Sequence, residues 1–433
     1  MGFPQNGGRK VAIVAGTRTP FARAWTAYRE LGSADLGAEA VRALLHRSDL
    51  DPQVIDQLIF GCVAAPTNGP NVGREVVFRS PMPASVPAST VQFYCASSAR
   101  AAVDGALQIA LGDADVVIAG GVESLSENQV LFSKKFTHAL QAASKAKSLP
   151  SRLAAFKGVG IGDLAPEVPG IDEPTTGKSM GQHAELMAKE MGISRQEQDA
   201  WSLESHRRAA AAYKAGHFKE QVATVTVAPK FDQPLSQDTD VRADATLEGL
   251  AKLKPVFDRY HGTVTAGNAS PLTDGASALL LMSEEKAKAL GYEPLAYIRS
   301  YAMAGVDIQK EHLLMGPTYS APIALERAGM KLSDMDLFEV HEAFAAQVIA
   351  TLRRFESKEH AQKLGLSEPI GTIDLAKMNP NGGSIAIGHP FGATGARVIM
   401  QAAYEMKRRN LGTAFISICA AGGLGLSMVL ERS

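Results

Sequence analysis

Two cysteines and two histidines each stand in a short segment of small residues. Cys95 lies in VQFYCASSARAA and His341 in EVHEAFAAQ, while His389 lies in GGSIAIGHPFGATGAR and Cys419 in ISICAAGGLG. A thiolate is a nucleophile and an imidazole can accept its proton. A fold that gathers these four side chains could therefore transfer an acyl group through a cysteine thioester. The chain has only 3 cysteines, and two of them lie in such segments.

The surroundings of each residue suggest a role. Cys95 precedes an Ala-rich stretch, Ala99–Leu111, that predicts a helix, and a helix N-terminus lowers a thiol pKa and offers N–H groups to an oxyanion. Glycines on both sides of His389 would let a substrate approach, so this histidine could take the cysteine proton. His341 could donate to a carbonyl oxygen, and Cys419 could exchange a proton with a substrate carbon. Taken singly, each could instead be a packing or surface residue.

Other kinds of chemistry find less support in the sequence. The zinc spacing HExxH is absent because Ala345 stands where the second histidine would be, and we expect no metal. No GxGxxG or P-loop pattern is convincing, so we expect neither a bound dinucleotide nor NTP chemistry. A formal net charge of −1 argues against a general nucleic-acid binder.

Composition indicates a globular protein with a substantial core. The 433 residues are 45% hydrophobic and 21% charged. Cysteines without CxxC spacing favour a reducing compartment. The uncharged run Ala414–Leu430 contains Ala-Ala-Gly-Gly-Leu-Gly, which favours two buried strands around a glycine loop over a membrane span. We expect a soluble, cytoplasmic protein.

Strands and helices alternate along both ends of the chain, which predicts an α/β fold. The N-terminal part suggests a strand at Val11–Gly16, a helix at Leu36–His46, the helix after Cys95 and a strand at Asp115–Ala119. The C-terminal part repeats the theme, with His389, a Gly-rich turn, a helix and the strand Thr413–Cys419. Two halves built alike suggest a duplicated fold. Residues 126–260 differ in pattern, and we interpret them as an inserted loop domain with helices at Gly181–Met191 and Ser194–Ala215.

Together these segments resemble the thiolase family over nearly the whole chain. Further matching motifs are AGTRTPF at Ala15–Phe21, AGGVES at Ala119–Ser124, SMGQHAE at Ser179–Glu185, FDRYHGTVTAGNASPLTDGAS at Phe257–Ser277 and LLMGPTYSAPIALERAG at Leu313–Gly329. HEAFAAQ, with PLTDGA and CAAGGLG, resembles the degradative 3-ketoacyl-CoA thiolases (acetyl-CoA acyltransferases) that form β subunits of fatty-acid oxidation (trifunctional) complexes.

The resemblance implies a thiolase fold. That fold has two similar βαβαβ-type halves, forming a layered α/β/α/β/α core, with an inserted loop domain. We expect an N-terminal half at 8–285, including the loop domain at about 126–260, and a C-terminal half at 286–433.

The resemblance also implies an activity, the CoA-dependent cleavage of 3-oxoacyl-CoA to acetyl-CoA and a shortened acyl-CoA in fatty-acid β-oxidation. Cys95 would be the nucleophile, His389 its base, His341 a donor and Cys419 the proton source. The backbone N–H groups of Cys95 and Ala421 would hold the oxyanion. Coenzyme A would be a co-substrate, with no permanently bound cofactor. Residues implied at the substrate and CoA channel are Ser270, Ala266, Leu272, Phe257, Met180 and Phe344.

Three alternatives stay open. An acetoacetyl-CoA thiolase is the first, although those enzymes usually carry Asn at the position of His341. A ketoacyl-ACP synthase also uses Cys-His-His, but Cys419 and the long insertion favour a thiolase. A non-catalytic acyl-CoA-binding scaffold is the third. Departures from the family pattern are Ala421, where Gly is usual, and Ser179, where many thiolases have a histidine that contacts CoA.

The resemblance suggests a homodimer, possibly within an α2β2 complex with a hydratase/dehydrogenase α subunit. The segment Ser133–Lys157 is rich in Lys and Arg and lacks acidic residues. It could be a solvated loop with helical turns, a peripheral membrane contact or a docking surface for the α subunit, since basic residues interleaved with apolar ones suit both of the latter roles.

Overall fold

The computed structural model describes residues 8–127, 130–166, 172–227 and 231–432. Within them, ten strands form one sheet in the order β10-β11-β12-β9-β1-β8-β5-β3-β4, with β2 beside β8. Their bounds are β1 Val11–Arg18, β2 Ala22–Arg23, β3 Gln57–Gly61, β4 Ala88–Val91, β5 Val116–Glu123, β8 Thr273–Ser283, β9 Ala296–Gly305, β10 Leu337–Val340, β11 Thr413–Ala420 and β12 Leu424–Glu431. A separate pair is β6 Asp172–Glu173 with β7 Lys178–Ser179.

Helices connect and cover these strands. Their bounds are α1 Ser33–Ser48, α2 Val72–Arg79, α3 Ser97–Leu111, α4 Lys134–Lys145, α5 Leu149–Ala154, α6 Met180–Glu190, α7 Arg195–Ala215, α8 Leu247–Ala251, α9 Glu284–Ala289, α10 Gly316–Ala328, α11 Ala345–Glu356, α12 Lys358–Lys363, α13 Ser384–Ile387 and α14 Phe391–Arg409. The strands and helices predicted at both ends of the chain are confirmed, including two strands, β11 and β12, across 414–430. No helix in the described part of the chain is long and apolar enough to cross a membrane.

The two halves repeat one topology. In the first half β1, α1, β3, α2, β4, α3 and β5 follow in order, and in the second half β9, α10, β10, α11, α14 and β11 do the same. β3 is parallel to β4 and β5, and β10 is parallel to β11. The place of β4 is taken in the second half by a single parallel bridge between Phe338 and Met378. The predicted duplicated α/β fold is confirmed.

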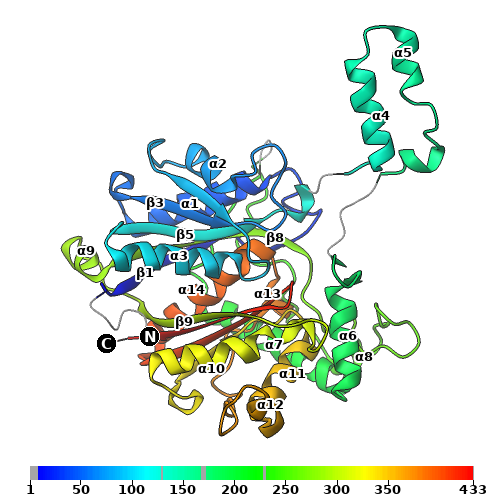
Figure 1. The fold of residues 1–433 in the computed structure, drawn as a ribbon. Coiled ribbons are helices and arrows are strands. Elements are labelled where there is room, and N and C mark those ends of the chain that lie inside the picture. The colour runs from blue at the N-terminus through cyan, green and yellow to red at the C-terminus, as the bar shows by residue number, and fades with distance from the viewer. Residues whose placement is uncertain (1–7, 128–129, 167–171, 228–230, 433) are drawn as a thin grey trace.

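Packing arranges the elements in layers, as Figure 1 shows. One apolar cluster joins α1 and α2 to one face of β1, β3, β5 and β8. A second joins α3 and α14 to strands of both halves, and a third joins α10 and α11 to β10, β11 and β12. Strands of the first half and strands of the second half lie on opposite sides of α3 and α14, although all belong to one continuous sheet. The order of the layers is therefore α/β/α/β/α, with α3 and α14 as the central helical layer.

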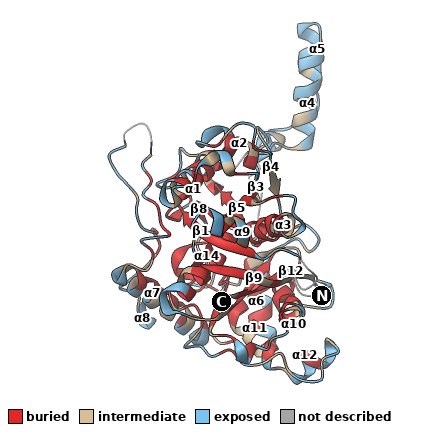
Figure 2. Cartoon of the chain, turned by 90° about the vertical axis from the view of Figure 1, so that its left-hand side faces the viewer, coloured by how far each residue is buried: buried red, intermediate tan, exposed pale blue. Residues whose placement is uncertain are grey.

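The predicted insertion leaves the first half between β5 and β8. Its helices α6 and α7 nevertheless pack on α11 and α13 of the second half. The insertion also contains α4 and α5, a helical hairpin that projects from the body in both views (Figures 1 and 2) and has mostly exposed residues. The basic segment Ser133–Lys157 is therefore a pair of helices.

Small residues allow α14 to approach α3 and β5 closely. A Cβ on Gly395 of α14 would lie 2.4 Å from the backbone nitrogen of Ala99 in α3, and a Cβ on Gly121 would lie 2.1 Å from the carbonyl oxygen of Gly392. The Ala396 N–H also donates to Ser98 Oγ at 2.8 Å. The N-terminal turns of the two central helices are thus held against each other.

Gly121→Ala should therefore lower the free energy of unfolding by about 1–3 kcal/mol, because the added methyl group meets backbone that cannot yield as a side chain would. Chemical denaturation followed by circular dichroism measures this. Gly305→Ala is the matched control, since Gly305 is also a strand glycine but its added Cβ would have an ordinary contact of 3.6 Å with Leu424. Equal stability of both variants and wild type would contradict the proposed close packing.

Candidate active site

A strained turn presents Cys95 ahead of the first central helix. The turn follows β4, and Tyr94 has a positive φ of 46°, a conformation that a bulky residue rarely adopts. The Ser97 hydroxyl donates to the Tyr94 carbonyl at 2.6 Å and accepts the Phe93 N–H at 2.8 Å. These bonds fix the turn, so the Cys95 side chain stands two residues before the first residue of α3.

His389 occupies the matching place before the second central helix, two residues ahead of Phe391 in α14. Gly388, before it, has φ of 111°, which glycine tolerates best. The His389 N–H donates to Thr273 Oγ1 at 2.8 Å. On its ring, Nδ1 contacts Thr394 Oγ1 at 2.6 Å, and that hydroxyl itself donates to the Pro390 carbonyl at 3.0 Å.

His341 directly follows β10, and its side chain lies beside that of His389. Its N–H donates to the Ser417 carbonyl of β11 at 2.9 Å, and its Nδ1 contacts Ser384 Oγ at 2.8 Å. The ring centroids of His341 and His389 lie 4.2 Å apart.

The Cys95 sulfur, one ring nitrogen of His341 and one ring nitrogen of His389 lie within 4.8 Å of one another. Both histidines are buried, and the Nε2 atoms of both have no hydrogen-bond partner among the described residues. Sulfur and imidazole nitrogen are also zinc ligands, so this cluster is where the described residues could hold a metal ion.

Cys419 and Ala421 complete the surroundings of the thiol. Cys419 is buried near the end of β11, close enough to Cys95 for the two thiols to interact electrostatically. The chain then turns through Gly422 and Gly423, which have φ of 70° and 71°. In this turn the Ala421 backbone hydrogen-bonds the Cys95 sulfur.

Burial keeps the cluster uncharged. Desolvation raises the pKa of Cys95 to about 12, although backbone hydrogen bonds from Ala421 and Cys95 itself act in the opposite direction. Desolvation and the nearby Arg397 lower the pKa of His389 to about 3. Desolvation, His389 and Arg397 hold the pKa of His341 well below its usual value, and burial raises that of Cys419 well above its own. Near neutral pH the resting site therefore holds thiols and neutral imidazoles.

Two buried carboxylates connect the site to helices α7 and α14. The sequence interpretation had not assigned either of them to the site. Glu342 accepts from Trp201 Nε1 at 3.1 Å and from Ser205 Oγ at 2.7 Å, both on α7 of the insertion. Glu123 accepts from the Gly392 N–H at 2.8 Å, at the start of α14. Burial raises the pKa of Glu123 to about 7.

The sequence interpretation also assigned no role to Ser384, Thr394 and Arg397. Each lies within the GGSIAIGHPFGATGAR motif around His389. Their position in that motif is the only sequence signal that could have indicated them, because their partners are known only from the fold.

The predicted channel residues fall into three groups. Ser270 lies beside the His341 segment, since its N–H donates to the Ala343 carbonyl at 2.9 Å. Met180, Phe257 and Phe344 pack against one apolar cluster. Ala266 and Leu272 are exposed, and none of the hydrogen bonds within the described residues joins them to the cysteine–histidine cluster.

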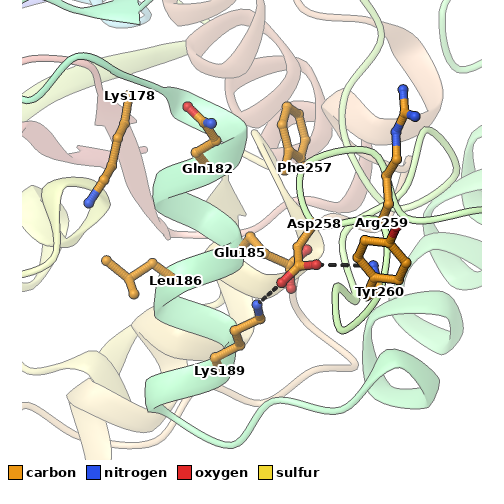
Figure 3. A pocket seen from close by; sticks show the side chains of 9 residues that line it. All are labelled: Lys178, Gln182, Glu185, Leu186, Lys189, Phe257, Asp258, Arg259 and Tyr260. Carbon is orange, nitrogen blue, oxygen red and sulfur yellow. Dashed lines mark hydrogen bonds and ion pairs between the residues drawn. The ribbon is translucent and has the colours of Figure 1, made fainter.

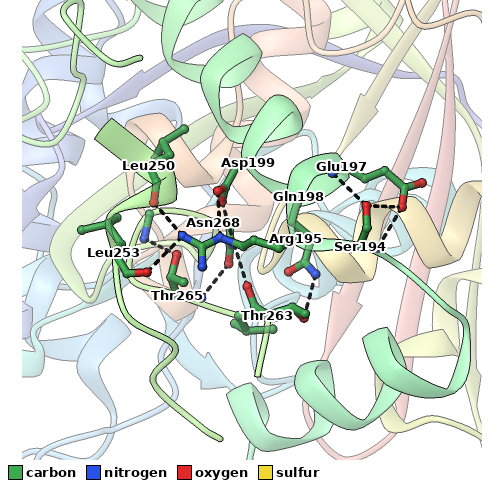
Figure 4. Close-up of polar contacts among 12 residues, drawn as sticks. Ser194, Arg195, Glu197, Gln198, Asp199, Leu250, Leu253, Thr263, Thr265 and Asn268 are labelled. Carbon is green, nitrogen blue, oxygen red and sulfur yellow. Dashed lines mark hydrogen bonds and ion pairs between the residues drawn. The ribbon is translucent and has the colours of Figure 1, made fainter. Parts of the chain in front are cut away.

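A polar network of the insertion holds the Ser270 segment in place (Figure 4). Asn268 Nδ2 donates to Asp199 Oδ1 at 3.0 Å, and Asp199 Oδ2 accepts from Arg195 Nε at 2.7 Å. The Ala345 N–H then donates to the Asn268 carbonyl at 2.9 Å. Helix α7 is thereby linked to the chain directly after His341.

A pocket of about 480 Å³ lies against α6 (Figure 3). Phe257 is the one predicted channel residue in its wall, and Met180 begins the helix that forms one side. Its lining residues are Lys178, Gln182, Glu185, Leu186, Lys189, Phe257, Asp258, Arg259 and Tyr260. Three of them are basic and two are acidic, and Lys189 forms an ion pair with Asp258. Lys178 and Arg259 are therefore the cationic groups that the pocket can offer to an anionic ligand.

Comparison with known proteins adds independent findings. Residues 11–285 match the family model "Thiolase, N-terminal domain", and residues 292–432 match "Thiolase, C-terminal domain". The chain is 48% identical over 425 residues to a 3-ketoacyl-CoA thiolase of Shewanella sp. strain W3-18-1, covering 98% of this chain and 97% of that protein. The 3-ketoacyl-CoA thiolase of Shewanella baltica strain OS185 gives the same values.

Solved structures agree in fold. Human mitochondrial 3-ketoacyl-CoA thiolase in complex with CoA superposes with a TM-score of 0.82 at 32% identity, covering 98% of both chains. The Bacillus anthracis acetyl-CoA acetyltransferase superposes with a TM-score of 0.83 at 33% identity, covering 98% of this chain and 99% of that chain.

The raised pKa of Cys95 predicts that the free protein shows no Cys95 thiolate between about pH 6 and about pH 9, since its ordinary pKa would already lie near the upper limit. The measurement is the ultraviolet absorbance of the thiolate, taken as the difference between wild type and Cys95→Ser across this range. A thiolate step near neutral pH would mean that Cys95 and His389 rest as an ion pair.

Proposed function

The chain belongs to the thiolase family, and from that premise we propose that it acts as a 3-ketoacyl-CoA thiolase through a thioester on Cys95. It cleaves 3-oxoacyl-CoA with CoA, giving acetyl-CoA and a shortened acyl-CoA in fatty-acid β-oxidation. The observation that carries the residue assignment is the cluster of Cys95, His341 and His389, whose reactive atoms lie within 4.8 Å of one another.

The first half-reaction begins with proton transfer from the Cys95 thiol to His389 Nε2. The thiolate attacks the keto carbon of the substrate, and the backbone N–H groups of Cys95 and Ala421 hold the oxyanion. The bond between C2 and C3 then breaks, the acyl group stays on Cys95, and His341 stabilises the oxygen of the acetyl-CoA enolate. Cys419 gives its proton to C2 and acetyl-CoA leaves. Each backbone N–H donor to the oxyanion contributes about 3 kcal/mol to stabilisation of the transition state.

The second half-reaction restores every proton. The CoA thiol gives its proton to the Cys419 thiolate and attacks the acyl thioester. The Cys95 thiolate leaves and recovers its proton from His389. No permanently bound cofactor is required by this scheme, and CoA is the co-substrate.

The pocket beside α6 suits the nucleotide end of CoA. Lys178 and Arg259 contribute positive charge to it, while Lys189 is paired with Asp258, and phosphate groups are recognised by basic side chains. Phe257 lines this pocket and, like Met180 and Phe344, packs against one apolar cluster. A channel along these residues, past Ser270, would lead the pantetheine arm towards the two histidines.

An acetoacetyl-CoA thiolase is the second candidate. The structural likeness to an acetyl-CoA acetyltransferase, with a TM-score of 0.83, favours it, whereas His341 favours the degradative enzyme. The two differ in the chain lengths that they accept.

CoA-dependent cleavage of 3-oxoacyl-CoAs with chains of four to sixteen carbons should release acetyl-CoA at rates that rise with chain length. Cys95→Ala should abolish this release, because no other group can carry the acyl chain. Incubation with substrate alone should leave an acyl adduct on the Cys95 peptide, measured by mass spectrometry.

Cys62→Ala is the matched control, because Cys62 is the remaining buried thiol and stands outside the proposed scheme. It should still form the acyl adduct on Cys95. Activity restricted to the four-carbon substrate would move the assignment to acetoacetyl-CoA thiolase. Substrate binding without any adduct would identify a non-catalytic scaffold, and efficient transfer from acyl carrier protein without CoA-dependent cleavage would identify a ketoacyl-ACP synthase.

We further propose a cytoplasmic homodimer that assembles with a hydratase/dehydrogenase α subunit. We also propose a division into halves at 8–285 and 286–433, with the loop domain at about 126–260. The α4–α5 hairpin suits contact with the α subunit or a membrane surface. Of its apolar side chains, Leu149 is 70% exposed and Leu153 67%, close in sequence to Lys145 and Lys147. Ile161, in the turn that follows the hairpin, is 90% exposed. Basic side chains beside exposed apolar ones favour both kinds of surface.

Changing Lys134, Lys135, Lys145 and Lys147 together to Gln should weaken binding to anionic liposomes or assembly with the α subunit, because positive charge near an anionic surface is lost. Liposome sedimentation measures membrane binding, and light scattering measures assembly with the α subunit. Light scattering by the isolated chain tests whether it forms a dimer. The control changes Lys252, Lys254, Lys331 and Lys358, which are exposed elsewhere, to Gln. If the hairpin variant matches wild type in both assays, the hairpin is a solvated surface feature.

A further inference from the structure

The hydroxyl group of Ser384 lies between a guanidinium and a catalytic ring. Arg397 Nη2 donates to Ser384 Oγ, and Ser384 Oγ contacts His341 Nδ1 at 2.8 Å. Ser384, Arg397 and His341 are 0%, 1% and 1% exposed. The atoms of this group without a hydrogen-bond partner among the described residues are Arg397 Nε and His341 Nε2. The buried Ser384 hydroxyl has two partners, and leaving its hydrogen unpaired would cost about 1–3 kcal/mol.

The direction of the bond to His341 follows from counting donors. A guanidinium has only donors, so Arg397 occupies one lone pair of Ser384 Oγ. The hydroxyl hydrogen then needs an acceptor, and the contacts within the described residues give Ser384 Oγ only one, His341 Nδ1. The Ser384 hydroxyl therefore donates to Nδ1, and the proton of the neutral His341 ring sits on Nε2.

The same count gives the opposite result for His389. The Thr394 hydroxyl spends its hydrogen on the Pro390 carbonyl at 3.0 Å, so it must accept from His389 Nδ1 at 2.6 Å. The Nε2 atom of His389 then carries a lone pair. Two adjacent rings, with centroids 4.2 Å apart, thus present different atoms to the site, a bare nitrogen on His389 and an N–H on His341.

We propose that Ser384, held by Arg397, is a positioning residue that keeps His341 in the Nε2–H tautomer and so makes it the donor to the enolate oxygen. This inference rests on the function proposed above and adds how the work is divided between the two histidines. The reverse tautomer would leave the Ser384 hydrogen without an acceptor and would turn a lone pair of His341 towards the enolate oxygen.

Arg397 strengthens this arrangement electrostatically. Its positive charge lowers the pKa of His341, which disfavours a protonated ring and keeps Nδ1 available as an acceptor. Desolvation lowers the pKa of Arg397 to about 10, and buried Glu339 opposes that lowering. Arg397 thus orients Ser384, and it adds to the desolvation and the effect of His389 that lower the pKa of His341.

The first test needs no variant. Nitrogen-15 NMR of histidine-labelled protein reports which ring nitrogen carries the proton, and the 10 histidines are assigned by single His→Gln changes. The expected result is Nε2–H for His341 and Nδ1–H for His389. A Nδ1–H signal for His341 would overturn the proposal, whether or not the protein shows thiolase activity, so the two conclusions fail separately.

The second test is kinetic. Ser384→Ala should lower kcat for thiolysis by about 10-fold. This loss is smaller than the 10²–10³-fold that removal of a whole oxyanion donor typically causes. KM should stay near its wild-type value, and the rate at which iodoacetamide labels Cys95 should not change, because that step uses His389. Ser384→Thr, which keeps the hydroxyl, should recover most of kcat.

The matched control is Ser320→Ala, which removes a buried hydroxyl that pairs with Ser427 at 2.8 Å outside the site. It should leave kcat unchanged. A kcat for Ser384→Ala within about twofold of wild type, or equal losses of kcat and of the Cys95 labelling rate, would overturn the positioning role in favour of a packing role.

Discussion

The geometry of this site depends on how closely α14 can approach α3 and β5. Side chains larger than those of Ala99, Gly121, Gly392 and Gly395 would separate these elements, because the available spaces are already below normal contact distances. Each central helix carries a reactive residue two positions before its start, Cys95 on one and His389 on the other. The separation between thiol and imidazole is thus set by backbone packing in the centre of the molecule, where cores yield little.

Duplication explains why the two reactive residues stand in matching places, and it also shows how the halves have diverged. His341 directly follows β10, and its counterpart directly after β3 is Cys62. Val340 pairs with Ser417, two residues before Cys419, and Gly61 pairs with Gly121, two residues before Glu123. The positions of His341 and Cys419 in the second half thus correspond to Cys62 and Glu123 in the first. There Glu123 accepts a hydrogen bond from Gly392 at the start of α14, so the first half uses the position equivalent to Cys419 to hold the helix that carries His389.

Much of this arrangement could be predicted from the sequence, and the missing part has a physical reason. Residue types and glycine-rich surroundings indicated Cys95, His341, His389 and Cys419, and strand–helix alternation indicated the layered fold. Nothing in the sequence indicated that α7 of the insertion would bind Glu342 through Trp201 and Ser205, because those residues are separated from it by 141 and 137 positions. Nor could it reveal the tautomers, which depend on hydroxyl donors whose partners are known only from the fold. The roles of the predicted site residues and the domain boundary near 285 stay predictions.

A neutral resting site has a consequence for how the thioester forms. With the pKa of Cys95 raised to about 12 and that of His389 lowered to about 3, separating charge between them in the unliganded site is strongly unfavourable. Charge separation becomes favourable only when the negative charge can move on to a group that the site stabilises. Backbone hydrogen bonds from Cys95 and Ala421 already act on the sulfur. These groups can therefore stabilise the negative charge on the thiolate and then on the substrate oxygen as the new bond forms. Proton transfer and attack are therefore coupled to the binding of an electrophile, and the partly buried Cys95 can remain a neutral thiol until one is in place.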